Sequence, residues 1–279
     1  MAEKDFCEEN LPSTRREVFF DVFKIRFRTF INLGLLLFLF ALPLIAASFI
    51  KDLILNSIHE DYINSVITAE ELNGLLKTTN LFYYLFRMIG YVILGVGFSG
   101  ALRVIRKIVW DEPLFFAKDF AEGIRLNVKH YAIYFSLMGL FGLLGRMALF
   151  ADVEKPILKL LPISINLFVF LPAMLYALTE TQIYTVNPFR EYKAGLILYI
   201  KTFPKTLLAT VIFCLPMLFE LIGLIVLKHV IISVFIIFIF PFVLTGETLY
   251  FMSGLDECIN KEQYPSIYRK GLYNKTSDR

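Results

Sequence analysis

Long runs of uncharged, apolar residues constrain the fold of this chain more than any other feature. Six runs contain no Asp, Glu, Lys or Arg over 14 residues or more: 29–50, 88–102, 131–145, 160–179, 206–219 and 230–246. A helix rises about 1.5 Å per residue, so it needs about 20 residues to cross a hydrocarbon core of about 30 Å. If one charge is allowed near an end, every run is long enough to cross a membrane.

These runs predict an all-α protein, a bundle of six transmembrane helices. The head, residues 1–29, mixes acidic and basic residues and lacks the features of a cleaved signal peptide, so we expect the first span to remain in the protein. An amphipathic helix is expected over 16–30, and residues 251–279 form a tail. The expected transmembrane domain covers 30–250, with spans at about 30–50, 81–105, 131–150, 158–185, 205–227 and 229–250.

The positions of Lys and Arg predict the orientation of the bundle. Most of these residues lie in the head, in the segments after the second and fourth spans, and in the tail. Because positive residues favour the cytoplasmic side, we expect both termini in the cytoplasm of a bacterial cell and the chain in its plasma membrane. Orientation in a lipid bilayer accounts for the basic residues, so they do not indicate a nucleic-acid partner.

Residues 51–80 form the one long segment expected outside the cell, and it is rich in Asp and Glu. Thr68 and Glu71 have the spacing of a capping box, in which each side chain satisfies a backbone N–H of the other residue. This spacing predicts a short amphipathic helix that ends near Lys77.

Two polar segments on the cytoplasmic side, 118–131 and 190–203, align without gaps and are called the matched segments below. We expect both to be interfacial helices: the first lies along the cytoplasmic surface, and the second, which is more apolar, lies deeper or is covered by protein. Repeats of a surface helix followed by two spans would explain the match, whereas convergence on a composition suited to an interface is the alternative. The polar residues assigned to these helices are Lys118, Glu122, Arg125, Lys129, Arg190, Lys193 and Lys201.

Three stretches resemble the YesL-like family of bacterial membrane proteins: LFALPLIA at 39–46, the run from GFSGALRVIRKIVWDEP to KHY at 97–131, and the run from FLPAMLYALTE to TLLA at 170–209. The resemblance implies no established activity. Members of the family tend to accompany systems for carbohydrate uptake and degradation, which implies an accessory role beside a transporter permease or ATPase. The long acidic segment 51–80 departs from the family pattern.

Motifs of common enzymes are absent from the sequence. It has no H-E-x-x-H, no G-x-S-x-G, no phosphate-binding loop and no paired C-x-x-C, so we expect neither an enzyme nor a metal site nor a cofactor. Glu180 and Glu247 lie near the inner ends of two spans, where we expect them to pair with Arg103 or Arg106.

Three charged residues are expected at similar depth in the outer half of the membrane: Arg87, Arg146 and Glu220. Charges at such a depth are costly, so they should face protein or water and find partners. One interpretation is a structural ion pair between Glu220 and one arginine, with the other arginine reaching toward the membrane surface. The other is a polar cavity, open to the outside, that binds an anionic or hydroxylated ligand.

Three functions fit these patterns. The first is a non-enzymatic accessory component for uptake of carbohydrates or similar solutes, which docks a partner through the surface helices. The second is a stand-alone transporter of small solutes that uses the outer-half charges. The third is a membrane sensor or an assembly scaffold, with the acidic outer segment as its receiving face.

Overall fold

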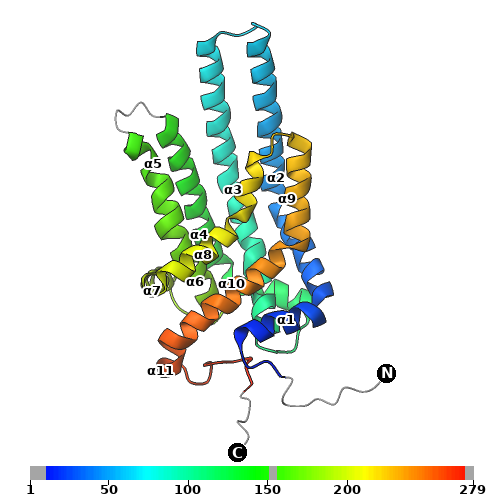
Figure 1. Cartoon of the computed structure of the whole chain (residues 1–279), viewed down its shortest axis with the longest axis vertical. Helices are drawn as coiled ribbons and strands as arrows, with labels where there is room; N and C mark the ends of the chain where they lie inside the picture. The colour runs from blue at the N-terminus through cyan, green and yellow to red at the C-terminus, as the bar shows by residue number, and fades with distance from the viewer. Residues whose placement is uncertain (1–10, 151–155, 274–279) are drawn as a thin grey trace, which may run out of the picture.

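The computed structural model describes residues 11–150 and 156–273, and every regular element in them is helical, as predicted. The helices are α1 (Arg15–Ile25), α2 (Phe27–Ile63), α3 (Ala69–Val109), α4 (Phe116–Phe150), α5 (Pro156–Ile165), α6 (Leu171–Glu180), α7 (Pro188–Lys201), α8 (Phe203–Phe213), α9 (Ile225–Phe238), α10 (Phe240–Leu255) and α11 (Lys261–Gln263). Figure 1 shows a bundle in which a long helical hairpin extends beyond the other helices, while α1 and α11, near the two ends of the described chain, lie at the opposite end.

The long hairpin consists of α2 and α3, and it replaces the loop expected over 51–80. The capping box is confirmed, because Thr68 accepts a hydrogen bond from the Glu71 backbone while the Glu71 carboxylate accepts one from the Thr68 backbone. The short helix predicted there is wrong, since α3 continues from Ala69 through the second span. The acidic residues interrupt neither helix. Unlike a proline, a charged side chain removes no backbone N–H and does not clash with a preceding carbonyl.

The first matched segment is the beginning of α4 and not a separate surface helix. Nothing in 118–131 breaks a helix, so α4 runs straight from this segment into the third span. The second matched segment does form its own helix, α7, whose axis makes an angle of 113° with that of α8. Pro204 lies in the first turn of α8, where its missing N–H favours a new helix start over continuation of α7.

The last two predicted spans are not continuous helices. The fifth, 205–227, contains most of α8, a 3₁₀ segment over Leu215–Leu221, a non-helical break over 222–224 and the first residues of α9. The sixth is divided into α9 and α10, which meet at an angle of 51° just before Pro241. The fourth span is continuous from Ile157 to Glu180, with one π-helical turn over Asn166–Phe170.

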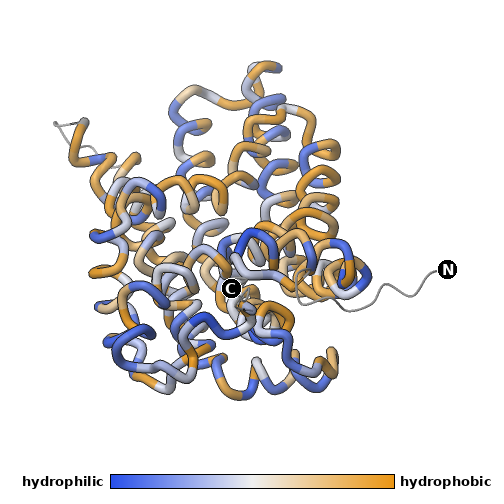
Figure 2. Tube along the Cα trace, turned by 60° about the horizontal axis from the view of Figure 1, so that its bottom comes forward, coloured by the Kyte–Doolittle hydropathy of each residue, from blue (hydrophilic) through white to orange (hydrophobic). Residues whose placement is uncertain are grey.

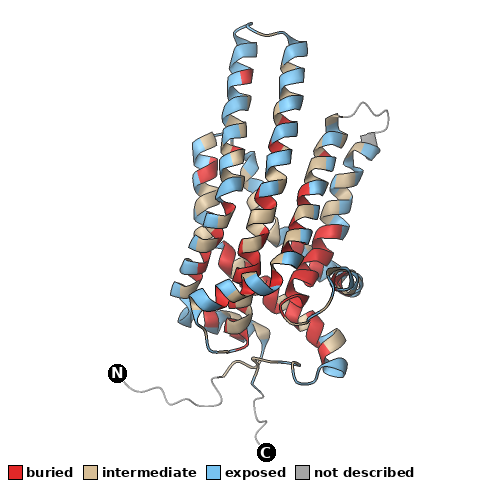
Figure 3. Ribbon diagram, turned by 180° about the vertical axis from the view of Figure 1, so that it is seen from behind, coloured by how far each residue is buried: buried red, intermediate tan, exposed pale blue. Residues whose placement is uncertain are grey.

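Four helices of the described chain are long and apolar enough to cross a membrane, and up to six spans exist if each bent pair counts as one. Figure 3 shows that buried residues gather toward the end that carries the chain termini, while much of the outer surface of the bundle is exposed. Large apolar side chains such as Leu39, Phe86 and Ile200 are among the exposed ones. A surface of this kind suits lipid contact, as expected for a membrane protein.

The end opposite the hairpin is called the terminal face, and it comprises α1, the turns 110–115 and 181–187, and residues 261–273. Figure 2 brings this face forward and shows its hydrophilic stretches at the ends of apolar helices. The two ends of the described chain meet here, since Tyr273 donates its backbone N–H to the Pro12 carbonyl at 2.9 Å. Lys270 pairs with Glu112 at 2.6 Å and lies over the Trp110 ring.

Glu112 remains charged at neutral pH in this arrangement. Burial alone would raise its pKa, but the hydrogen bond from Lys270 and the charges of Arg106 and other nearby cations lower it below its ordinary value. The tail beyond α10 is therefore attached to the turn between α3 and α4.

The two matched segments make the same kind of packing contact, each through a glycine that lies against the preceding helix. A Cβ at Gly123 would lie 2.7 Å from the carbonyl oxygen of Ser99, and one at Gly195 would lie 2.5 Å from that of Ala173. Each glycine thus allows its helix to approach the preceding helix of the chain closely. This shared contact supports the internal repeat, although the helices that follow the two segments differ.

Candidate functional site

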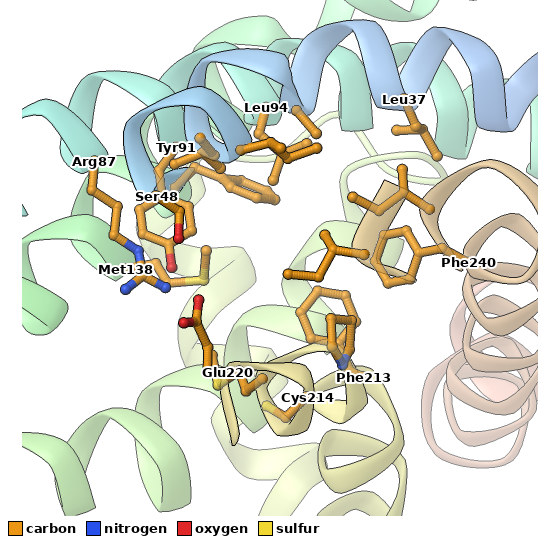
Figure 4. A pocket seen from close by; sticks show the side chains of 18 of the residues that line it. Leu37, Ser48, Arg87, Tyr91, Leu94, Met138, Phe213, Cys214, Glu220 and Phe240 are labelled. Atoms are coloured by element: carbon orange, nitrogen blue, oxygen red, sulfur yellow. The ribbon is translucent and has the colours of Figure 1, made fainter. Parts of the chain in front are cut away.

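A central cavity of about 200 Å³ lies between α2, α3, α4, the 3₁₀ segment and α9. Figure 4 shows that Arg87, Ser48 and Glu220 lie toward one end of this cavity, whereas Leu37 and Phe240 lie toward the other. The remaining walls are almost entirely apolar. The cavity therefore has a polar end and an apolar end, which suits a ligand with the same division.

Arg87 is held at the polar end by aromatic rings. Its guanidinium carbon lies 5.7 Å from the ring centre of Tyr83, 5.5 Å from that of Tyr84 and 5.2 Å from that of Tyr91. Aromatic faces stabilise a cation without neutralising its charge. Among the described residues no carboxylate lies within 4.0 Å of this guanidinium, so its charge remains available to an anion.

Glu220 faces the same cavity from the 3₁₀ segment but pairs with a lysine. Its carboxylate lies 3.2 Å from the amine of Lys228, which also contacts Asp52, and the ion pair predicted with an arginine is wrong. The Glu220 side chain is 44% exposed, so the cavity reaches the surface beside it. His229 completes the group, with Nε2 at 3.9 Å from Asp52.

Sequence reasoning missed Lys228 and Asp52 because it assigned both to outer loops. In the structure α2 continues past residue 52, and Lys228 lies in the first turn of α9, where it is 5% exposed. One signal was present: Lys228 is the single formally charged residue between Glu220 and Glu247, which is unusual unless it has a partner.

Arg146 does not belong to the cavity. It lies on α4 beside a separate surface groove that includes Lys77 and Tyr84, and its guanidinium is 4.7 Å from the ring centre of Phe150. The prediction that three charges share one site is therefore wrong for Arg146. Arg87 and Glu220 do line the same cavity. Position along a helix does not fix which side of the helix a residue occupies.

The pairing predicted for the inner-end residues is wrong. Arg103 pairs with Glu122 at 2.8 Å, and Arg106 pairs with Glu112 at 3.2 Å. Both arginines lie near the end of α3. Glu112 in the following turn and Glu122 in α4 are close to them and form the pairs. Neither carboxyl predicted to meet them, that of Glu180 or of Glu247, has a salt bridge among the described residues.

The acidic residues of the matched segments are buried, which the sequence did not indicate. Asp119 is 1% exposed and pairs with Lys107 at 2.7 Å. Glu191 is also 1% exposed, and its carboxylate accepts hydrogen bonds from Thr181 and Tyr134. These carboxylates attach α4 and α7 to the preceding turns, and they are structural contacts.

The basic residues of the matched segments remain at the surface. Glu122 is half-buried in its pair with Arg103, whereas the basic residues of both segments are exposed: Lys118, Arg125, Lys129, Arg190, Lys193 and Lys201. Within the described ranges no three His, Cys, Asp or Glu side chains gather as a metal site would require.

A second apolar groove of about 520 Å³ runs between α2 and α3. Its walls include Phe82, Phe86 and Ile89, whose side chains are more than half exposed. This groove therefore lies on the outer surface of the bundle, whereas the central cavity lies between several helices and reaches the surface beside Glu220.

No protein-family model, curated protein or solved structure matches this chain. The function is therefore argued from the central cavity and the surfaces around it.

Proposed function

We propose that the protein binds a small amphipathic solute with an anionic group in the central cavity and takes part in its passage across a bacterial cell membrane. The observation that carries this proposal is Arg87, a cation enclosed by three tyrosine rings at the polar end, with no carboxylate partner among the described residues. A ligand carboxylate would form charge-assisted hydrogen bonds with this guanidinium.

The apolar end of the cavity narrows the chemistry of the solute. A sugar presents hydroxyl groups on all sides, and each one left without a partner against Leu37 or Phe240 would weaken binding. A carboxylate with a short hydrocarbon chain matches both ends. With the terminal face in the cytoplasm, as the distribution of Lys and Arg suggests, the polar end of the cavity lies toward the outside.

Sodium octanoate should therefore raise the apparent melting temperature of the purified protein in detergent. At a concentration about 100 times its Kd, the ligand would stabilise the folded state by about 2.7 kcal/mol, which corresponds to a rise of roughly 5 °C or more. Octanol and octylamine match its chain without the carboxylate and should give little or no shift. Equal shifts from all three compounds would show a nonspecific effect of the chain and contradict the proposal.

An accessory role beside a transporter permease or ATPase is a second proposal, supported by α7. This helix makes an angle of 113° with α8 and exposes Phe189, Ile200 and Lys193. Co-purification of such a partner from native membranes, lost when Phe189 and Ile200 are changed to serine, would favour this role. Uptake of octanoate by proteoliposomes that contain the protein alone would favour the stand-alone carrier.

A further inference from the structure

Glu247 is a buried carboxyl group that the contacts described so far leave unused. It lies in the middle of α10, is 7% exposed, and neither carboxylate oxygen has a hydrogen-bond partner among the described residues. Buried polar groups in folded proteins nearly always have partners, so an orphaned carboxyl needs an explanation. In apolar surroundings the charged form is strongly disfavoured and the neutral acid is the stable form.

Among the described residues, no cation pairs with Glu247 within 4.0 Å. It lines a small cavity of about 10 Å³ with side chains of α3, α6, α8 and α10, among which Thr179 and Thr248 donate their hydroxyls to carbonyls of their own helices. The ring of Phe19 on α1 approaches the neighbouring Gly246. Cys214, whose thiol also lines the central cavity, is a nearby titratable group.

Two aromatic side chains are shared by the linings of this small cavity and of the central one. Phe98 and Phe213 line both cavities, with ring centres 6.2 Å apart, and each lies 5.8 Å from the ring of Phe240. Figure 4 shows Phe213 and Phe240 away from Arg87, at the far side of the central cavity. Phe213 is the last residue of α8, next to the 3₁₀ segment, and it is only partly buried. A rotation of this ring would join the two cavities.

We propose that Glu247 is a proton-binding site that opens to the central cavity when the Phe213 ring moves. In the closed arrangement the carboxyl carries its proton. When water enters, the O–H bond breaks, its electron pair stays on the carboxylate, and the proton passes to that water. Coupling of this proton to solute movement rests on the proposed function, whereas proton binding itself does not.

Carbodiimide labelling tests proton binding without any solute. Dicyclohexylcarbodiimide modifies protonated carboxyls in apolar surroundings, so at neutral pH it should label Glu247 at least about tenfold more than Asp119, a carboxylate buried to a similar degree but paired with Lys107. Mass spectrometry of peptides distinguishes the two sites and also resolves Glu180. Labelling of Glu247 no stronger than that of Asp119 would overturn the proposal. Glu247→Gln removes no observed hydrogen bond, so it should fold and lose this label.

The path to the central cavity is tested by Phe213→Ala and by the milder Phe213→Leu. A smaller side chain admits water to Glu247, so half-maximal labelling should shift to lower pH by about one unit, a tenfold change in proton affinity, while labelling of Glu180 stays unchanged. An unchanged profile in a folded variant would show that Glu247 does not communicate with the central cavity. Because neither experiment uses octanoate, failure here leaves solute binding intact, and failure of solute binding leaves this result intact.

Discussion

Replacing Arg87 with methionine should lower the affinity for octanoate by about a hundredfold. Methionine keeps the length and apolar contacts of the side chain, so it can still pack against the tyrosine rings while losing the charge. The ligand carboxylate would then be enclosed at the polar end without a cation. Arg87→Lys keeps the charge but not the planar fork of donors, and we expect a loss of about tenfold. Isothermal titration of the purified protein in detergent measures both affinities.

Arg146→Met is the matched control for this experiment. Arg146 has a similar expected depth and also contacts an aromatic ring, but it lies outside the central cavity. Its substitution should leave the affinity for octanoate unchanged within error. Equal losses in the two variants would mean that general surface charge, and not the cavity, attracts the carboxylate.

Gly34→Ala should destabilise the bundle by about 3 kcal/mol or more, since overpacking of a fixed contact usually costs about 1–3 kcal/mol and the obstacle here is backbone. A Cβ at this position would lie 1.9 Å from the carbonyl oxygen of Ile237 in α9. This carbonyl lacks the usual helical donor because Pro241, four residues later, has no N–H. α2 therefore approaches α9 closely at the bend between α9 and α10. In the Gly34→Ala protein, α2 and α9 would have to move apart.

Gly74→Ala is the matched control, because Gly74 also lies inside a long helix but nothing approaches within 4 Å of its Cβ position. Alanine is the better helix former, so this variant should be unchanged or more stable by about 0.5–1 kcal/mol. Apparent melting temperatures, compared at one scan rate, measure both effects. A Gly34→Ala protein as stable as the Gly74→Ala protein would contradict the packing of α2 on α9.

The sequence predicted helices better than it predicted their interruptions. Charge-free runs identify segments that suit the membrane, and α2 passes through Pro43 without a break. Pro204 and Pro241 do mark sharp changes of direction, and no local feature separates these prolines from Pro43. The difference depends on whether neighbouring helices support a continuous or a bent arrangement, which is a tertiary effect.

The candidate site could be predicted only in part for a similar reason. Arg87 and Glu220 stand out because charges in apolar runs require partners, and they do share the cavity. Lys228, the partner of Glu220, was missed because it was assigned to an outer loop. The apolar sequence around residue 225 gives no sign that α9 begins there. The orphaned state of Glu247 was also missed, because it depends on Arg103 and Arg106 being occupied by Glu122 and Glu112.

Photolabelling tests most directly whether the central cavity holds the solute with its carboxylate at Arg87. An octanoate with a diazirine on its last chain carbon should, after illumination and mass spectrometry, label the apolar end of the cavity at Leu37, Ile236 or Phe240, and unlabelled octanoate should compete. Labels confined to the groove between α2 and α3, at Ile50, Phe82 or Phe86, would place the compound on the lipid-facing surface and contradict the account.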